Sequence, residues 1–429
     1  MSQEALPRPN ILRAIWVSQT VRFWFLHLLA LLAGVVIPLL FIGRGAASIL
    51  VPLIGAMAAV VLLSSKPEQR AEIWRGGTLS WAIVAMLSIM LPSVIVSIKP
   101  GFSLAIWLQL AGLLLLTACL PVFLTERRDA FDWTLRALLV MSLIGAAIAV
   151  ISIFIWPPLL GLVRPVDTPS AYHSALRLKS YGAVMPCLAP VLLWAGFRFG
   201  RAWRAVAIAA VVLGGLVVYG VDNRAALGGY AGAAGFVLIA LLLRHVSLVL
   251  RFVILMPLLA AVGAVGIWVV THLPAMPYDG SQPMRIPTWL IDSHRQVIWG
   301  FVLDRALERP WLGWGLSTAN FMPGADDPVP IIGQTFVPLH PHNWVLQIFC
   351  EAGIFGLVSV AGVVLLFLRW LYRSAASGHA ASWAALGLSG AFFVSSLANF
   401  AIWQGWWQSV FAILMAVALA GTRAVLRGR

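Results

Sequence analysis

Two histidines at the start of a long apolar run are the side chains in this sequence best placed for acid–base chemistry. They are His340 and His342, in the stretch 339–343 (LHPHN) that joins the longest polar segment to the apolar run 344–368. Asn343 predicts a helix N-cap, because its side chain can accept from the first free backbone amides. The positive end of that helix disfavours the imidazolium form of His342, and a neutral imidazole is the form that accepts a proton. The alternative is a simple amphipathic anchor at a membrane interface.

A second group consists of cations suited to binding phosphate oxygens. Arg164, Arg177 and Lys179 lie in the segment 158–180, and the last two are separated by one residue where an apolar run begins. Arginine binds phosphate as a bidentate fork and lysine as a point charge. The pattern favours phosphate binding, with contact to membrane headgroups as the alternative.

A further arginine, Arg224, lies in the tight turn 220–229 between two apolar runs. An arginine so close to an apolar zone is energetically costly and usually functional. The alternative is a structural salt bridge to Asp222, but one carboxylate does not satisfy the whole guanidinium fork. We therefore favour a functional role for Arg224.

The elements that must position these groups are membrane helices. The chain has 429 residues, of which 61% are hydrophobic and 10% charged, and its mean hydropathy is +0.94. This composition is typical of an integral membrane protein, in which apolar runs of about 20 residues predict spanning helices. The expected fold class is all-α, with about twelve transmembrane helices. The runs lie at 23–43, 46–64, 78–97, 103–124, 135–157, 181–198, 203–221, 225–243, 248–271, 344–368, 381–399 and 403–422.

The distribution of basic residues predicts the orientation in the membrane. Nineteen of the 29 Lys and Arg residues fall in one set of loops and helix ends, and the other ten fall in the opposite set. We expect the first set, with both termini, to be cytoplasmic. The ten on the outer side are Arg44, Lys99, Arg164, Arg177, Lys179, Arg224, Arg285, Arg295, Arg305 and Arg309. The net charge of +14 needs no nucleic acid as a partner, because topology and anionic lipid explain the excess.

The outer segment 272–343 is too long to be a passive connector. Its middle part, 293–309, predicts an amphipathic helix with one face on the membrane or on the helix bundle. Arg295 falls on the apolar face, where it either binds substrate or anchors the helix by snorkelling. The apolar face is formed by Trp299, Val302, Leu303, Ala306 and Leu307, with Val297, Ile298 and Phe301 on the charged side.

The expected organisation has three segments: nine transmembrane helices in 1–271, the loop in 272–343, and three further helices in 344–429. Glu351 lies in the last segment, nine residues after His342 and thus about 13 Å deeper at 1.5 Å per residue. At that distance it is not expected to orient His342 directly, so we favour a structural role for its carboxyl group.

Metal and disulfide chemistry are not indicated. Cys119, Cys187 and Cys350 all fall in predicted helices, with neither disulfide nor metal-type spacing. Asp326 and Asp327 are the nearest acidic pair to the histidines, and a solvated turn is the favoured interpretation of them. We therefore expect no metal and no cofactor.

Three features together resemble the O-antigen ligase and polymerase family of bacterial envelope membrane enzymes. They are Arg224 in a short outer turn, Arg295 followed by Arg309-Pro310-Trp311-Leu312-Gly313-Trp314-Gly315, and His342-Asn343 followed at the family spacing by Gly353 and Gly356. The resemblance covers roughly residues 164–356, and the first half of the chain offers no matching motif. Ligases of this family join a glycan carried on undecaprenyl diphosphate to the lipid A–core oligosaccharide.

The resemblance implies a glycosyltransferase-C-like enzyme of the bacterial inner membrane, with its site on the periplasmic face. The implied partners are the lipid-linked glycan donor, the lipid A–core acceptor and membrane lipids. His342 is favoured over His340 as the acting histidine, because it directly precedes the asparagine. The residues expected to be catalytic are His342, Arg224 and Arg295, and those expected to bind substrate are Arg177, Lys179, Arg164 and His340.

The expected reaction is a metal-independent single displacement that inverts the anomeric centre. Alternatives with the same chemistry are an O-antigen polymerase and a protein O-oligosaccharyltransferase. A lipid-linked glycan flippase is an alternative of a different class. A transporter should place polar groups at the bilayer midplane, whereas nearly all the candidate groups here lie at the outer face, which favours an enzyme.

Overall fold

The computed structural model describes residues 19–64, 77–164, 170–330 and 332–426, and its regular elements in that part of the chain are all helices. The predicted all-α fold class is confirmed. The N-terminal arm up to residue 18, the basic stretch 65–76, residues 165–169, and Arg427 and Arg429 lie outside the described residues.

Each of the twelve predicted apolar runs coincides with a helix. Among the described residues, ten helices are long and apolar enough to span a membrane, and the apolar helices α2 and α15 are shorter. The helices are α2 (Gln19–Val35), η1 (Pro38–Phe41), α3 (Arg44–Ser64), α5 (Thr78–Ile95), α6 (Pro100–Leu124), α7 (Arg128–Phe154), α8 (Pro158–Val163), α9 (Ala171–Phe199), α10 (Arg201–Gly220), α11 (Arg224–Leu243), α12 (Leu248–His272), α13 (Ser293–Glu308), η2 (Ala319–Phe321), α14 (Trp344–Ala376), α15 (Ala380–Ser395) and α16 (Gly405–Leu426). The protein is thus a multi-pass membrane protein.

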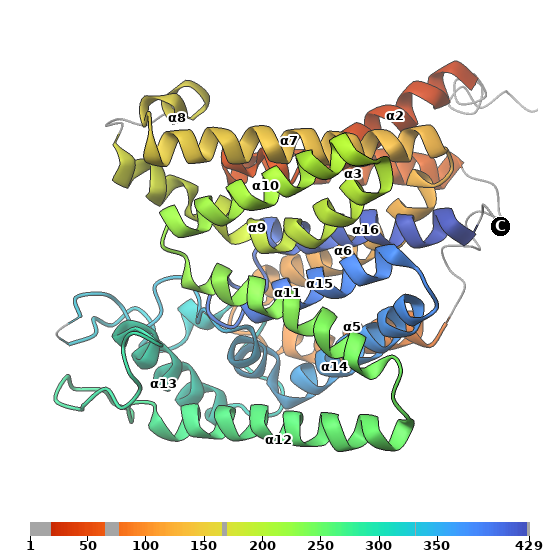
Figure 1. Ribbon diagram of the computed structural model, residues 1–429. Coiled ribbons are helices and arrows are strands. Elements are labelled where there is room, and N and C mark those ends of the chain that lie inside the picture. Colours follow the sequence, from red (N-terminus) through yellow and green to blue (C-terminus); the bar gives the residue numbers. More distant parts are fainter. Residues whose placement is uncertain (1–18, 65–76, 165–169, 331, 427–429) are drawn as a thin grey trace, which may run out of the picture. The chain divides into compact units, whose positions relative to one another are not determined.

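The chain forms two compact units. The first comprises the described residues within 1–75, 115–222 and 412–429. In it α7 packs against α2, α9 and α10 (Figure 1). Helix α9 begins at a side-chain cap, because Ser170 accepts from the backbone N–H of His173 at 3.2 Å. This unit carries Arg164, Arg177 and Lys179.

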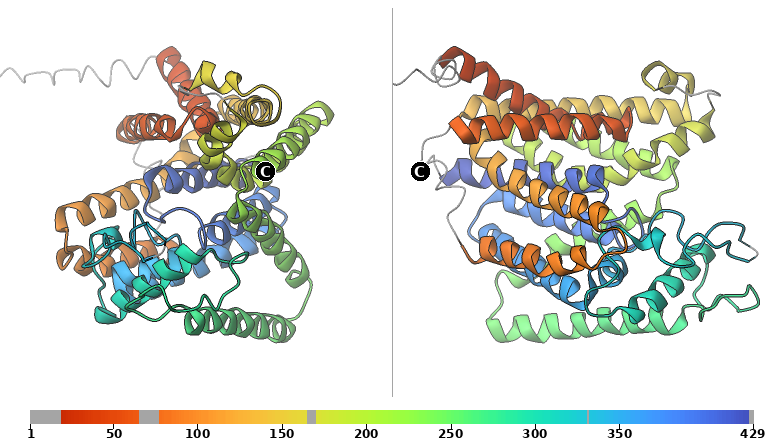
Figure 2. Two further views of the ribbon diagram at one scale, coloured as in Figure 1. Left: turned by 90° about the vertical axis from the view of Figure 1, so that its left-hand side faces the viewer. Right: turned by 180° about the vertical axis from the view of Figure 1, so that it is seen from behind.

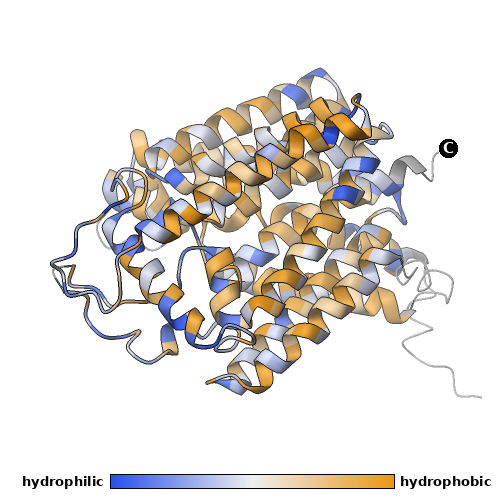
Figure 3. Cartoon of the chain, turned by 90° about the horizontal axis from the view of Figure 1, so that it is seen from below, coloured by the Kyte–Doolittle hydropathy of each residue, from blue (hydrophilic) through white to orange (hydrophobic). Residues whose placement is uncertain are grey.

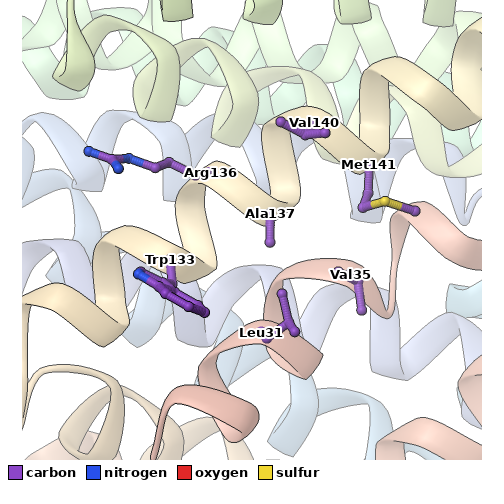
Figure 4. A pocket seen from close by; sticks show the side chains of 7 residues that line it. All are labelled: Leu31, Val35, Trp133, Arg136, Ala137, Val140 and Met141. Carbon is purple, nitrogen blue, oxygen red and sulfur yellow. The ribbon is translucent and has the colours of Figure 1, made fainter.

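An open hollow of about 510 Å³ lies in the first unit between α2 and α7. Its lining is apolar apart from Arg136, whose guanidinium lies over the rings of Phe199 and Trp203 at 5.1 and 5.8 Å. The residues that line it are Leu31, Val35, Trp133, Arg136, Ala137, Val140 and Met141 (Figure 4). None of the predicted site residues lines this hollow. We therefore do not identify it as the catalytic site.

The second unit comprises residues 76–114 and 223–411, and it carries Arg224, Arg295 and both histidines. Helix α11 packs along α15, and α14 packs against α5, α13 and α15. The loops on either side of α13 lie at one end of this unit, beside the start of α11 and of α14 (Figures 1 and 2). Coloured by hydropathy, the helices are mainly hydrophobic and these loops carry more of the hydrophilic residues (Figure 3). Helix α12 has no buried residue, as expected of an apolar helix surrounded by lipid.

Helix α13 is present where the sequence predicts it, but the predicted division of its faces was wrong. Val297, Ile298 and Phe301, expected on the charged side, are buried. Leu307, expected on the apolar side, is 63% exposed. The reason is that the chain after α13 folds back over the helix, so that both faces are covered between 296 and 302. The returning residues in this apolar cluster are Ala319, Met322, Ala325 and Val337.

Helix α14 is interrupted at Gly353, whose φ of 66° and ψ of −172° are not helical. Positive φ is accessible to glycine at little steric cost. A side chain at this position would also collide with the backbone carbonyl of Trp311. Both constraints require glycine, and they explain why residue 353 belongs to the spacing seen in the sequence.

The motif after α13 fills the interruption in α14. The N–H groups of Trp314 and Gly315 donate to the carbonyls of Cys350 and Glu351, at 3.0 and 2.9 Å. In the other direction, the N–H of Ile354 donates to the carbonyl of Pro310 at 2.8 Å. These bonds satisfy backbone groups that the break leaves without helical partners. Segment 310–315 is therefore fixed to the helix that starts beside His342.

Candidate functional site

The start of α14 positions His342 as predicted. The side chain of Asn343 caps the helix by accepting from the N–H groups of Val345 and Leu346, both at 3.1 Å. The Nδ1 atom of His342 lies 2.6 Å from the carbonyl oxygen of Asn399, in the linker between α15 and α16. A carbonyl only accepts, so Nδ1 carries the proton. In the neutral ring the lone pair therefore lies on Nε2.

The backbone of His342 is held in an uncommon conformation. Its φ is 58°, in the left-handed region that few non-glycine residues adopt. Its N–H donates to Nδ1 of His340 at 3.2 Å, and the two rings lie 4.1 Å apart. Trp299 of α13 donates from Nε1 to the carbonyl of Pro341 at 2.8 Å. His340 is only 5% exposed, and its ring contacts the backbone that carries His342.

Burial, followed by the positive charge of Arg295, lowers the pKa of His342 to about 4. The bond to the Asn399 carbonyl and the negative charge of Asp292 act in the opposite direction and are weaker. The predicted direction of the shift is confirmed, although burial is its largest cause. His342 is neutral at pH 7, in the form that can accept a proton.

Arg295 lies in the first turn of α13, close enough to His342 for its charge to affect that ring. Asp292 caps this helix by accepting from the backbone N–H of Arg295 at 3.0 Å. The same carboxylate pairs with Nε of Arg295 at 3.2 Å. Within the described residues, the two terminal nitrogens of Arg295 have no protein partner. The guanidinium is thus oriented by its inner nitrogen, and its two terminal nitrogens remain available as donors.

Arg224 is the first residue of α11, after the N-cap Asn223. Its Nη1 atom donates to the carbonyl of Trp289 at 2.9 Å. Trp289 is three residues before Asp292, so Arg224 is connected to the segment that leads into α13. The other two guanidinium nitrogens have no partner in the part of the chain that the structure describes.

Two of the predicted cations of the first unit, Arg164 and Arg177, are in contact near the end of α8. Arg164 donates from Nη1 to the carbonyl of Arg177 at 2.9 Å. Burial, with the charges of Arg177 and Arg44, lowers the pKa of Arg164. Lys179 lies two residues beyond Arg177 on α9, and both residues are exposed. Arg164 thus lies near Arg177 and near Arg44, which the sequence did not single out.

Glu351 is fully buried in α14, and both carboxylate oxygens accept hydrogen bonds. Oε1 accepts from the N–H of Ala319 at 3.1 Å and from Nε2 of Gln347 at 3.3 Å. Oε2 accepts from the N–H of Ser317 at 2.9 Å and from the indole N–H of Trp403. The group therefore joins α14 to the loop after α13 and to the linker before α16, which fits the structural role expected of it.

Sequence reasoning missed Asn399 and Gln347. Asn399 acts through its backbone carbonyl, which has no sequence signature. Gln347 had a signal, because it lies four residues before Glu351 and so on the same helix face. As for metals, no three His, Cys, Asp or Glu side chains gather in the manner of metal ligands within the described ranges.

Comparison with known proteins points to the same region. Residues 209–361 match the family described as "O-Antigen ligase". A protein of Rickettsia conorii named "Putative polysaccharide ligase RC0486" is 32% identical over 120 residues, which are 27% of this chain and 29% of that protein. The Rickettsia prowazekii protein "Putative polysaccharide ligase RP358" is 30% identical over 118 residues, with the same shares. The chain therefore spans less than a third of the length of these relatives. It contains a region similar to the O-antigen ligase family, and that region includes Arg224, Arg295 and His342.

Proposed function

We propose that this protein is a glycosyltransferase of the bacterial inner membrane. It joins O-antigen glycan from undecaprenyl diphosphate to the lipid A–core oligosaccharide, on the periplasmic face. The observation that carries the proposal is Nε2 of His342, the acceptor nitrogen of a neutral ring, in the field of Arg295. Transfer from a lipid diphosphate needs both a proton acceptor and a cation for the leaving group.

The reaction is a single displacement at the anomeric carbon of the donor sugar. The acceptor hydroxyl oxygen forms the new bond to that carbon, and its proton passes to Nε2 of His342. The bond from the carbon to the diphosphate oxygen breaks, and its electron pair leaves with undecaprenyl diphosphate. Attack opposite the leaving group inverts the anomeric centre. No metal or cofactor takes part in this scheme.

The arginines stabilise the negative charge that develops on the diphosphate. Arg295 and Arg224 each hold a protein oxygen with one nitrogen and keep other nitrogens available as donors. A guanidinium that is already oriented needs little rearrangement to bind phosphate oxygens. The anionic donor is attracted by three further cations, Arg164, Arg177 and Lys179. His340 contributes to the substrate site and holds the backbone of His342.

The bonding of Glu351 favours an enzyme over a flippase. A transporter uses intramembrane ionisable groups to bind its cargo or coupling ions. Here the deep carboxyl is occupied by four protein donors, whereas Arg224 and Arg295 at the ends of helices keep nitrogens available. A polymerase or a protein O-oligosaccharyltransferase would use the same displacement with a different acceptor.

The acceptor is tested by deleting the gene and examining lipopolysaccharide and lipid-linked glycan on gels. Loss of a ligase leaves bare core and accumulates long lipid-linked polymer. Wild-type protein should restore the ladder of lipopolysaccharide bands that carry O-antigen. His342→Ala, produced at the same level, should not. Core carrying a single repeat unit would identify a polymerase instead, and unchanged lipopolysaccharide would exclude both activities.

A further inference from the structure

The linker between α15 and α16 supplies the hydrogen-bond partner of His342, although this linker has no regular structure of its own. Residues 396–404 lie between the two helices, and Asn399 is in the middle of them. The side chain of Asn399 donates to Oγ of Ser395, at the end of α15, at 3.2 Å. The position of its carbonyl also depends on what holds the rest of the linker. In the neutral ring, that carbonyl decides which nitrogen of His342 is left as the acceptor.

Helix α14 holds the linker on both sides of Asn399. Before it, the N–H of Trp344 donates to the carbonyl of Ser396 at 3.2 Å. After it, the N–H of Ile402 donates to Oε1 of Gln347 at 3.1 Å, and the indole of Trp403 donates to Glu351. The helix that starts beside His342 thus also fixes the carbonyl that His342 binds.

Gln347 and Glu351 act as a matched pair in this contact. Gln347 needs an oxygen for the Ile402 N–H and an N–H for Glu351, and an amide supplies both. Glu351 receives two donors on each oxygen, which a carboxylate accepts and an amide does not. Their side chains are 1% and 0% exposed, so water does not replace a lost partner.

We propose that Gln347 and Glu351 are positioning residues that hold linker 396–404 so that the Asn399 carbonyl keeps the proton of His342 on Nδ1. Nε2 is thereby kept as the proton acceptor. This inference rests on the proposed function for its catalytic consequence, but the tautomer itself is a property of the folded protein. When the pair is broken, the linker moves, the carbonyl leaves Nδ1, and the ring no longer has a fixed tautomer.

The test uses full-length protein in nanodiscs and compares Gln347→Met with Gln408→Met. Both changes remove a buried amide of the second unit. Gln408 accepts from Gln109 at 2.8 Å and does not bond Asn399 or His342, and its loss leaves the bond from Gln109 to the Trp403 carbonyl, at 2.9 Å, in place. Gln347→Met should lower kcat by roughly 100-fold, as a misplaced catalytic group does, with little change in KM. Gln347→Glu keeps an oxygen for Ile402 but loses the N–H that Glu351 accepts and places a second acidic group against it, so this variant should not recover kcat. Glu351→Gln should resemble Gln347→Met, and Gln408→Met should resemble wild type.

A second measurement does not depend on activity. Nitrogen-15 spectra of labelled histidine distinguish an Nδ1–H ring from an Nε2–H ring, and the signal lost in His342→Gln identifies residue 342. Wild type and Gln408→Met should show Nδ1–H at this residue, and Gln347→Met should show a mixture. If correctly folded Gln347→Met keeps the wild-type tautomer, the inference is overturned. This holds even if wild-type protein transfers glycan normally and the proposed function is correct. If Gln347→Met changes the tautomer but wild-type protein transfers no glycan, the proposed function is overturned and the inference on the linker stands.

Discussion

The Nδ1 atom of His340 accepts a hydrogen bond from the backbone N–H of His342 at 3.2 Å. Its neutral ring therefore carries the proton on Nε2, the opposite arrangement from His342, whose Nδ1 donates to Asn399. Two adjacent histidines thus have different tasks: one holds a backbone with a φ of 58°, and the other presents an acceptor nitrogen.

Substitution should separate these tasks. His342→Ala removes the proton acceptor and should lower transfer by about 100- to 10,000-fold. His340→Ala removes the support of the neighbouring backbone but leaves the proton acceptor in place, and should cost less. His340→Asn keeps a side-chain oxygen near the position of Nδ1 and should approach wild type. The measurement is transfer with purified donor and acceptor, and a fully active His342→Ala would exclude it as the base.

The pH dependence follows from the pKa of His342, which burial and Arg295 lower to about 4. Only the neutral ring accepts a proton, so kcat/KM should rise as pH rises through about 4 and be level at neutral pH. A bound diphosphate offsets the charge of Arg295 and raises this pKa, so the rise in kcat should be centred at a higher pH. A rate that falls as pH rises would show that His342 instead binds phosphate as a cation.

The two arginines should be sensitive to the shape of the side chain as well as to its charge. Arg224→Ala and Arg295→Ala each remove a donor to developing charge, which costs about 100- to 1000-fold in rate. Arg224→Lys should be nearly as damaging, because an ammonium group does not reproduce the fork that binds Trp289 and a phosphate together. Initial rates at matched protein levels provide the measurement. Near-normal transfer by both alanine variants would remove the arginines from the mechanism.

The interruption in α14 offers a matched pair of glycine substitutions. Gly353→Ala forces a side chain into positive φ, at about 1–3 kcal/mol for the backbone alone, and against the Trp311 carbonyl. Gly362→Ala lies in the same helix with nothing within 4 Å of the new methyl, and should be neutral or stabilising. Thermal unfolding in detergent provides the comparison. Equal melting temperatures would show that the break does not require glycine.

The predicted orientation is tested by labelling single cysteines with an impermeant reagent. The native Cys119, Cys187 and Cys350 are buried, so their background labelling should be low. A cysteine at the exposed Asp326 should react from the periplasm, and one at the exposed Ser377, between α14 and α15, only after the membrane is opened. The reverse pattern would invert the proposed topology and place the site on the cytoplasmic face.

The sequence predicts the helices well because apolar runs of spanning length have few other stable structures in a membrane. It also predicts the N-cap at Asn343, because capping depends on adjacent residues. The lowered pKa of His342 was expected from helix polarity and nearby arginines, whereas its largest cause is burial, which the local pattern does not show. The proximity of Arg295 to His342 could be expected only through the family resemblance, since 46 residues of loop and helix separate them.

Other features depend on tertiary structure and were not predictable from local pattern. The faces of α13 were assigned from its own periodicity, but the returning loop buries Val297 and Phe301 as well. The partner of His342 is a backbone oxygen 57 residues away, to which any residue type could contribute. The contact that leaves Nε2 as the proton acceptor therefore cannot be predicted from composition or residue spacing.

The break in α14 also affects how hybrid proteins can be built from this chain and a relative. Loop 272–343 looks like an exchangeable insert, with natural junctions at residues 271 and 344. Its backbone, however, completes the hydrogen bonding of α14 at 350–354. A junction at residue 344 would therefore pair a loop from one parent with a helix break from the other. A junction beyond Gly356 keeps both partners from the same parent and allows the graft to fold as a unit.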